Sequence, residues 1–310
     1  MTRLGLVAVV ILAVLVIAVL VVVWLILKRP MALLAWGTRR SLAANGLQKR
    51  VVPTPVGPQA IFVGGAGPVL VLIHGAGDHA GTWAAAVKTL VKDHTLIIPD
   101  LAGHGDSAPA EGPIDTAQVY QGLEAILAAE AQGRPLTLVG NSLGAWMAMV
   151  LAQRHPDWVA RVVAVNGGPL LGSSTKVRLL PASREEARET MAQLRDPGSR
   201  AIPDHVLDDL VRIGRTGPLA RLAGTALTMG AWLLTEDQLR DLRLPVRLVW
   251  GVSDQLMPLD YARRMLAVLP DAELIPVERS GHVPQLESPA RFLAALQQAL
   301  GEAPANGSRT

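Results

Sequence analysis

The chain lacks cysteine, has few aromatic residues and carries little charge for its length. Its 310 residues include no Cys, 4% aromatic and 18% charged residues, whereas 50% are hydrophobic. The absence of cysteine excludes disulfides, thiolate metal sites and a cysteine nucleophile, although it leaves the redox compartment open. High apolar content together with low charge argues against a disordered chain. The length allows one large domain or two small ones.

Acidic residues are absent from the first fifty positions, which hold seven basic residues. Residues 51–310 therefore carry 22 basic and 26 acidic residues, a net charge of −4, although the formal net charge of the whole chain is +3. Because this globular part is mildly acidic, its composition gives no reason to expect nucleic acid as a partner.

No charge interrupts the 24 residues from Leu4 to Leu27, which are mostly Val, Leu, Ile and Ala. As a helix, this run would span about 36 Å, enough to cross the core of a bilayer with some tilt. A cleaved signal peptide has a shorter hydrophobic region and a small-x-small cleavage site, whereas Lys28-Arg29-Pro30-Met31 follows here. We therefore predict a transmembrane anchor over residues 1–30, embedded in lipid through residues 4–27.

The basic residues that flank this anchor predict its orientation. Arg3 precedes the apolar run, whereas six Lys and Arg residues follow it before residue 51. Positive charge tends to stay in the cytoplasm, so we expect a single-pass protein of a bacterial-type plasma membrane with its globular domain in the cytoplasm. Residues 31–54 are predicted to be a basic juxtamembrane linker. Within it, residues 31–50 could form an amphipathic helix on anionic lipid or remain a solvated linker, and both interpretations stay open.

Beyond residue 55, short apolar runs alternate with longer helical stretches. The runs are rich in Val, Leu and Ile and predict buried strands at Val69–Ile73, Thr95–Ile98, Leu136–Val139, Val162–Val165, Val246–Trp250 and Leu274–Val277. Helices are predicted between and after them at His79–Val91, Asp115–Ala131, Leu143–Arg154, Leu259–Leu269 and Pro289–Leu300. This alternation predicts an α/β fold with a mostly parallel, doubly wound sheet.

The alternation stops between Val165 and Val246, where we find helical patterns and no convincing strand. These patterns cover Arg184–Arg195, Asp204–Ile213 and Leu219–Leu234. We therefore predict a helical cap inserted into one core, with a disordered tail at the end. The predicted parts are a first core segment over 55–168, the cap over 169–243, a second core segment over 244–301 and the tail over 302–310.

The sequence Gly140-Asn141-Ser142-Leu143-Gly144 lies directly after a predicted strand and directly before a predicted helix. It fits the Gly-x-Ser-x-Gly nucleophile elbow in the strand–turn–helix context that this motif requires. The turn is so tight that the residues two before and two after the serine must be small. Ser142 is therefore our candidate nucleophile.

A serine nucleophile needs a base, and the base needs a third group to orient it. His282 follows the last predicted strand, and it is the only His beyond position 205. Asp254 follows the strand that ends at Trp250, so the chain order is Ser, Asp, His. Asn166 stands at an alternative position for the acid but cannot carry the charge. Asp260 and Asp271 lie in helix or helix-end positions and are set aside.

Backbone N–H groups are the expected donors to the oxyanion that forms in acyl transfer. Leu143, directly after the nucleophile, should supply one of them. The loop after the strand Val69–Ile73 should supply the other, and we assign it to Ala76. His74 in the same loop is expected to make a structural hydrogen bond rather than to act as a base.

These stretches together resemble the α/β-hydrolase superfamily of serine hydrolases with a helical cap. The resemblance covers about residues 55–300 apart from the cap, and it implies that the turn from Asp100 to Ser107 is structural rather than a metal site. It also implies that neither a metal nor a cofactor is required. The matching stretches are His74-Gly75-Ala76-Gly77 with Trp83, the run Pro99 to Ser107, the elbow, Trp250-Gly251-x-x-Asp254-x-x-x-Pro258, and Gly281-His282-x-Pro284-x-x-Glu287-x-Pro289.

Within this superfamily, Ser142 excludes the relatives that open epoxides or remove halide with an aspartate at the elbow. The elbow also resembles that of carbon–carbon hydrolases of ring-fission products, but Val283 and Leu286 stand where those enzymes commonly carry Trp. An N-terminal anchor followed by this fold resembles membrane-bound monoacylglycerol lipases and related esterases. The resemblance therefore implies an ester hydrolase acting on lipid-like substrates, with a carbon–carbon hydrolase or a catalytically silent binding module as alternatives.

The apolar residues of the cap allow two interpretations: they line an acyl channel or contact lipid, or they pack the cap onto the core. Acyl length, head group, pathway and oligomeric state are not predicted from the sequence. The residues concerned are Leu222, Leu227, Met229, Trp232, Leu233 and Leu234.

Overall fold

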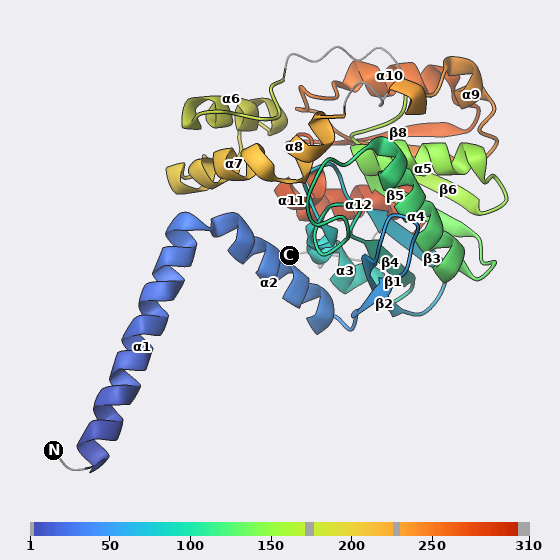
Figure 1. Ribbon diagram of the computed structural model, residues 1–310. Helices are drawn as coiled ribbons and strands as arrows, with labels where there is room; N and C mark the ends of the chain where they lie inside the picture. The colour runs from blue at the N-terminus through green and yellow to red at the C-terminus, as the bar shows by residue number, and fades with distance from the viewer. Residues whose placement is uncertain (1–2, 171–176, 226–229, 303–310) are drawn as a thin grey trace, which may run out of the picture.

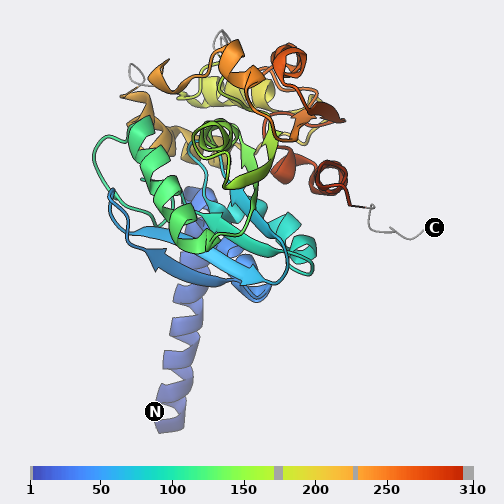
Figure 2. The same cartoon turned by 90° about the vertical axis from the view of Figure 1, so that its right-hand side faces the viewer.

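A computed structural model describes residues 3–170, 177–225 and 230–302. Helix α1 (Arg3–Lys28) projects away from the rest of the molecule, as Figures 1 and 2 both show. Its stretch Val9–Lys28 is long and apolar enough to cross a membrane, and none of that stretch is buried. The predicted N-terminal apolar helix is therefore present, and its stretch Val9–Lys28 is not buried.

Eight strands form one mixed sheet in the order β1-β2-β4-β3-β5-β6-β7-β8, in which β1, β2 and β4 pair antiparallel and the other pairs are parallel. This confirms the predicted α/β class with a mostly parallel sheet. The strands are β1 (Gln48–Val52), β2 (Gln59–Gly65), β3 (Val69–Ile73), β4 (Thr95–Pro99), β5 (Leu136–Asn141), β6 (Val159–Val165), β7 (Val246–Gly251) and β8 (Ala272–Val277).

The two N-terminal strands are absent from the sequence prediction, whereas the other six lie where it expects them. Strand β2 is buried over most of its length, but its two terminal glycines weaken the apolar pattern. Strand β1 is an edge strand that exposes Lys49 and Arg50, so it lacks the apolar run typical of a buried strand. Because β1 pairs with β2, the segment predicted as a linker over 31–54 contributes a strand to the sheet.

Helices cover both faces of the sheet, because its central strands are apolar on both sides. In β3, Val69, Val71 and Ile73 pack on one face with α4 and α5, whereas Leu70 and Leu72 pack on the other with α3 and α12. The helices of the core are η1 (Ala80–Trp83), α3 (Ala84–Leu90), α4 (Thr116–Ala131), α5 (Leu143–Arg154), α10 (Leu259–Val268), α11 (Pro284–Glu287) and α12 (Pro289–Leu300).

Helix α2 (Pro30–Ala44) follows α1 after one residue and packs against the globular part of the molecule (Figure 1). Leu42 is completely buried in the same cluster as Phe62 and Trp83. Leu34 and Trp36 on the same helix are exposed. Residues 31–50 are predicted from the sequence to be either an amphipathic helix on lipid or a solvated linker. The structure has a helix there, but one face of this helix packs in the protein core.

Between β6 and β7, the described part of the chain holds four α-helices. The backbone N–H of Met31 on α2 donates to the carboxylate of Asp209 on α7, so the helix beside α1 also contacts this region. Leu227 and Met229, two of the six apolar cap residues named from the sequence (the apolar stripe), lie outside the described residues, as do residues 303–310 of the predicted tail. The four helices are α6 (Arg184–Leu194), α7 (Asp204–Thr216), α8 (Pro218–Ala223) and α9 (Glu236–Arg240).

The burial of Leu42 predicts that α2 stabilises the globular domain. We expect Leu42→Ala to lower the free energy of unfolding by about 2–5 kcal/mol, because truncating a fully buried Leu leaves a cavity. Leu34→Ala on the same helix is the control and should change it by less than about 0.5 kcal/mol, because that side chain is exposed. Denaturant unfolding of the full chain in detergent, followed by Trp fluorescence, measures both. Equal midpoints for the two variants would contradict this prediction.

Candidate active site

Ser142 lies in the turn that joins the end of β5 to the start of α5. Its backbone has φ 54° and ψ −115°, a conformation that non-glycine residues rarely adopt and that stores strain at functional sites. Its N–H donates to the carbonyl of Val165 at 2.9 Å, and its carbonyl accepts from Trp146 at 3.1 Å. These two bonds hold the strained turn against β6 and the first turn of α5.

Three glycines surround this turn because no side chain fits there. A Cβ at Gly140 would lie 2.2 Å from the carbonyl carbon of Gly144, and a Cβ at Gly144 would lie 2.3 Å from the carbonyl oxygen of Ile73. A Cβ at Gly167, beyond the end of β6, would lie 2.4 Å from the carbonyl oxygen of Ser142. The structure thus gives the steric reason for small residues on both sides of the serine, and it adds Gly167, which sequence reasoning missed.

The side chains of His282 and Asp254 meet at the carboxyl end of the sheet. Nδ1 of His282 lies 2.7 Å from Oδ2 of Asp254, whose side chain is fully buried. The other carboxylate oxygen, Oδ1, accepts from the backbone N–H groups of Leu256 at 2.9 Å and Met257 at 3.1 Å. With an ionised carboxylate as acceptor, Nδ1 carries the proton, which leaves Nε2 of His282 as the nitrogen that accepts.

Asn166, which sequence reasoning considered only as a failed acid, binds the carboxylate of Asp254. Its Nδ2 donates to Oδ2 of Asp254 at 2.8 Å, and its Oδ1 accepts from the N–H of Gly251 at 2.8 Å. The position of Asn166 at the end of β6 was the one feature of the sequence that could have indicated this role. Asp260 and Asp271, by contrast, form exposed ion pairs with Arg263 and Arg247.

The end of α6 holds the loop that carries His282. The N–H of His282 donates to the carbonyl of Leu194 at 2.8 Å, and Nδ2 of Asn141 donates to the carbonyl of His282 at 3.0 Å. The carboxylate of Glu287 accepts from Gly281 at 2.6 Å and from Asp196 beyond α6 at 2.9 Å. The position of the histidine therefore depends on contacts with the inserted helices, which sequence patterns do not reveal.

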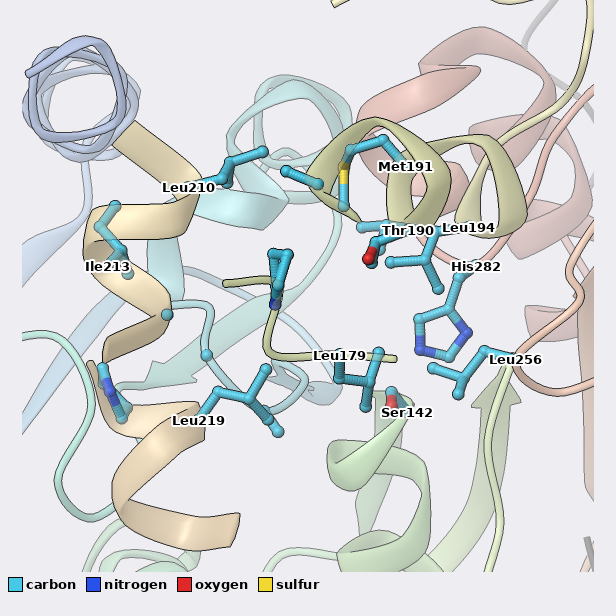
Figure 3. A pocket seen from close by; sticks show the side chains of 17 residues that line it. Ser142, Leu179, Thr190, Met191, Leu194, Leu210, Ile213, Leu219, Leu256 and His282 are labelled. Atoms are coloured by element: carbon cyan, nitrogen blue, oxygen red, sulfur yellow. The ribbon is translucent and has the colours of Figure 1, made fainter. Parts of the chain in front are cut away.

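Ser142 and His282 line one apolar cavity of about 210 Å³. Figure 3 shows both side chains toward one end of it, and Leu210 and Ile213 on α7 toward the other. A second apolar cavity of about 340 Å³ also reaches Ser142. Residues shared by the two cavities are Ala76, Ser142, Leu179, Leu219 and Leu256.

The described residues of the apolar stripe split between the two roles considered for them. Leu222 and Leu233 line the second cavity, which Trp146 and Tyr261 border on the core side. Leu234 is buried, and the carbonyl of Trp232, two residues earlier, accepts a hydrogen bond from Trp146 Nε1 at 2.7 Å. This segment therefore both packs onto the core and forms part of a cavity wall.

The two residues assigned to the oxyanion hole lie beside Ser142. Leu143 is the first residue of α5, so its N–H is one of those that the helix itself does not use. Ala76 lines both cavities that reach Ser142. The carbonyl of Gly75, which belongs to the same peptide unit as the Ala76 N–H, accepts from Nδ1 of His74 at 2.7 Å and from the N–H of Asp78 at 3.3 Å. The assignment of both donors stays a prediction.

His74 is completely buried and its ring has a defined tautomer. Its Nδ1 binds the carbonyl of Gly75, and its Nε2 accepts from the N–H of Leu101 at 3.0 Å, so the neutral Nδ1–H form satisfies both contacts. Burial, with a contribution from His104, lowers the pKa of His74 well below its usual value. These contacts are those of a structural residue.

The turn from Asp100 to Ser107 is tied together by its own hydrogen bonds. Asp100 accepts from the N–H groups of Ala80 at 2.8 Å and Asp106 at 3.0 Å, and Ser107 Oγ donates to the carbonyl of Asp100 at 2.7 Å. Within residues 3–170, 177–225 and 230–302, no group of three or more His, Asp or Glu side chains is arranged to hold a metal ion. The Asp100 carboxylate thus binds backbone N–H groups of this turn and of η1 as well as the side chain of Arg39.

Comparisons with known proteins identify the family of the chain. The family described as the alpha/beta hydrolase family matches residues 70–295. An uncharacterized protein of Mycobacterium tuberculosis is 31% identical over 271 residues, covering 77% of this chain and 77% of that protein. The pimeloyl-[acyl-carrier protein] methyl ester esterase of Aromatoleum aromaticum is 31% identical over 246 residues, covering 72% of this chain and 94% of the esterase.

Solved structures share the fold at lower sequence identity. A membrane phospholipase A, described as a bacterial virulence factor, superposes with a TM-score of 0.76 at 23% identity, covering 97% of this chain and 98% of that one. A carboxylesterase of Bacillus subtilis has a TM-score of 0.70 at 17% identity, covering 86% and 98%. At these identities the likeness concerns the fold alone.

The buried histidine His104 predicts that acid destabilises the fold. Burial is the main cause that lowers its pKa from 6.5 to about 4. As the pH falls below 6.5, the unfolded chain binds a proton that the folded chain does not, so the free energy of unfolding decreases until about pH 4, by on the order of 3 kcal/mol for this residue. The lowered pKa of His74 acts in the same direction.

We expect the free energy of unfolding of His104→Gln to depend less on pH than that of the wild type. Denaturant titrations at pH 5 and 7.5 measure this. If the free energy of unfolding changes equally between pH 5 and 7.5 in both proteins, the prediction is contradicted.

Proposed function

The chain belongs to the alpha/beta hydrolase family, as its motifs predict, and on this premise we propose that it is a membrane-anchored serine hydrolase that cleaves carboxylic esters. One observation carries the proposal above the others. Ser142 occupies the strained turn after β5 and shares an apolar cavity with His282, whose Nδ1 is held by the buried Asp254.

In the proposed mechanism, Nε2 of His282 removes the proton from Ser142 Oγ as this oxygen attacks the ester carbonyl carbon. The negative charge that develops on the carbonyl oxygen is stabilised by the N–H groups of Ala76 and Leu143. His282 then protonates the leaving alcohol, and an acyl-enzyme remains on Ser142. Water, deprotonated by His282, releases the acid and restores the serine. The mechanism requires neither a metal nor a cofactor.

The lining of the two cavities supports esters with apolar chains as substrates. Leu, Met, Val and Ile side chains supply most of the walls, and few polar groups besides Ser142 and His282 face the first cavity. Two similar proteins are a methyl ester esterase and a membrane phospholipase A. We therefore propose lipid-like or amphipathic esters, such as monoacylglycerols, as the substrate class.

We further propose that α1 anchors the enzyme in a bilayer and that the globular domain is cytoplasmic. The uncharged, unburied stretch of α1 supports a membrane span, and the basic residues that follow it support this orientation. Tethering raises the effective concentration of the enzyme for substrates that partition into lipid. The anchor and the apolar cavities thus favour the same substrate class.

Replacing the nucleophile should abolish ester hydrolysis. We expect Ser142→Ala and His282→Ala each to lower kcat by about 10⁴-fold or more, because the triad acts as a unit. Hydrolysis of p-nitrophenyl esters by the purified full chain in detergent measures this, with Ser288→Ala as the control because its hydroxyl donates an exposed hydrogen bond to the carbonyl of Arg279. Full ester turnover by Ser142→Ala would refute the proposal.

Two further measurements separate the alternatives. A panel of esters graded by acyl length, assayed beside a ring-fission dienone, distinguishes an ester hydrolase from a carbon–carbon hydrolase, because only the latter would prefer the dienone. Labelling by a fluorophosphonate probe tests the nucleophile without assuming a substrate. A folded wild-type protein that stays unlabelled would instead indicate a catalytically silent binding module.

The anchor predicts firm membrane association. We expect the full chain to remain in the membrane pellet after alkaline carbonate extraction, whereas a variant that lacks residues 1–28 should appear in the supernatant. Protease added to sealed inverted vesicles should digest the globular domain if it is cytoplasmic, and protease added to right-side-out vesicles should not. A mature protein shortened by cleavage after α1 would show that the helix is a signal sequence instead.

A further inference from the structure

Arg39 on α2 forms a partly buried ion pair with the core of the protein. Its Nη2 lies 2.8 Å from Oδ2 of Asp100, and the Asp100 side chain is fully buried while that of Arg39 is 17% exposed. Its Nη1 binds Asp106, which also receives Nζ of Lys49 at 2.6 Å. Removing Arg39 would leave the buried carboxylate of Asp100 without its cationic partner, which is strongly unfavourable.

Asp100 connects this ion pair to the loop that carries Ala76. Its Oδ1 accepts from the N–H of Ala80, the first residue of η1, which follows that loop. Helix α2 also contacts η1 directly, because a Cβ on Gly81 would lie 2.4 Å from Oγ1 of Thr38. Thr38 and Arg39, two neighbouring residues of α2, therefore contact the end of this loop, Thr38 directly at η1 and Arg39 through Asp100.

A second line of contacts runs from Asp100 to the peptide that contains the Ala76 N–H. The next residue, Leu101, donates its N–H to Nε2 of His74, and Nδ1 of His74 donates to the carbonyl of Gly75. The peptide unit is planar and trans, so its C=O and N–H point in opposite directions. Holding the Gly75 carbonyl on the His74 side consequently turns the Ala76 N–H away from it.

We propose that Arg39 is a positioning residue for the oxyanion donor Ala76, acting through Asp100 and His74. This inference rests on the proposed function, since it concerns the same site. In this view α2 does more than connect the apolar helix to the enzyme: it holds one of the two donors in the orientation that the transition state requires.

The glycine at position 105 fits this interpretation. It has φ +54°, and a Cβ there would lie 2.3 Å from Nη2 of Arg39 and 2.3 Å from Cγ of Asp100. A side chain would therefore push the guanidinium away from the carboxylate. Gly105→Ala perturbs the ion pair while keeping both charged residues, which makes it an independent second variant.

The test compares Arg39→Met and Arg39→Lys with Arg40→Met, using the full chain in detergent. Arg40 is the matched control because it is the next residue and is exposed, with its guanidinium 5.0 Å from the Trp36 ring centroid. Three quantities are measured: kcat and KM on a water-soluble ester, the affinity of a trifluoromethyl ketone that forms a tetrahedral adduct, and the rate of fluorophosphonate labelling. Thermal unfolding shows whether each variant is folded.

For Arg39→Met we expect kcat to fall about 10- to 100-fold, with KM changed less than about 2-fold, because an oxyanion donor acts in the transition state. Affinity for the ketone and the labelling rate should fall by a similar factor. Arg39→Lys should recover part of the loss, Gly105→Ala should resemble Arg39→Met, and Arg40→Met should match the wild type.

The inference is overturned if folded Arg39→Met keeps the wild-type kcat and ketone affinity, or if only KM changes. If Arg39→Met does not fold, Arg39→Lys and Gly105→Ala decide by the same criteria. A purely structural role would lower the unfolding temperature without a matching loss of ketone affinity. Failure of the proposed function itself looks different, because the wild type would then neither turn over esters nor react with the fluorophosphonate.

Discussion

A buried negative charge organises the candidate active site. The Asp254 carboxylate has no contact with solvent, so its charge is tolerated only because protein groups replace water around it. The donors come from three separate places: the amide of Asn166 after β6, two backbone N–H groups after β7, and the ring of His282 after β8. Because these loops all leave the carboxyl ends of neighbouring strands, the sheet order itself brings the donors together.

The features predictable from the sequence are those encoded by neighbouring residues. The elbow around Ser142 and the apolar runs of the central strands each lie within a few positions, so their patterns suffice. Strand β1 and the role of Asn166 were missed because their meaning depends on partners far along the chain. The ion pair between Arg39 and Asp100 joins residues 61 positions apart, and no local pattern indicates it.

The inserted helices contribute to the geometry of the candidate active site as well as to the cavity walls. The carbonyl of Leu194 at the end of α6 binds the backbone of His282, and Glu287 bridges that loop to the segment after α6. Residues of α6 also line the first cavity, so the same helix borders the cavity and contacts the loop that carries His282.

If α1 spans a bilayer as proposed, its junction with α2 would determine how the globular domain can move above the membrane. Only Arg29 separates the two helices, and backbone hydrogen bonds continue across it from Arg29 to Leu25 and from Leu33 to Arg29. A flexible tether would let the domain tumble above the lipid. The one-residue junction with its continued hydrogen bonds instead leaves almost no loose chain between α1 and the domain. In the proposed membrane-anchored enzyme, lateral diffusion of the whole molecule, rather than swinging of the domain, would therefore set how much of the membrane one molecule can survey.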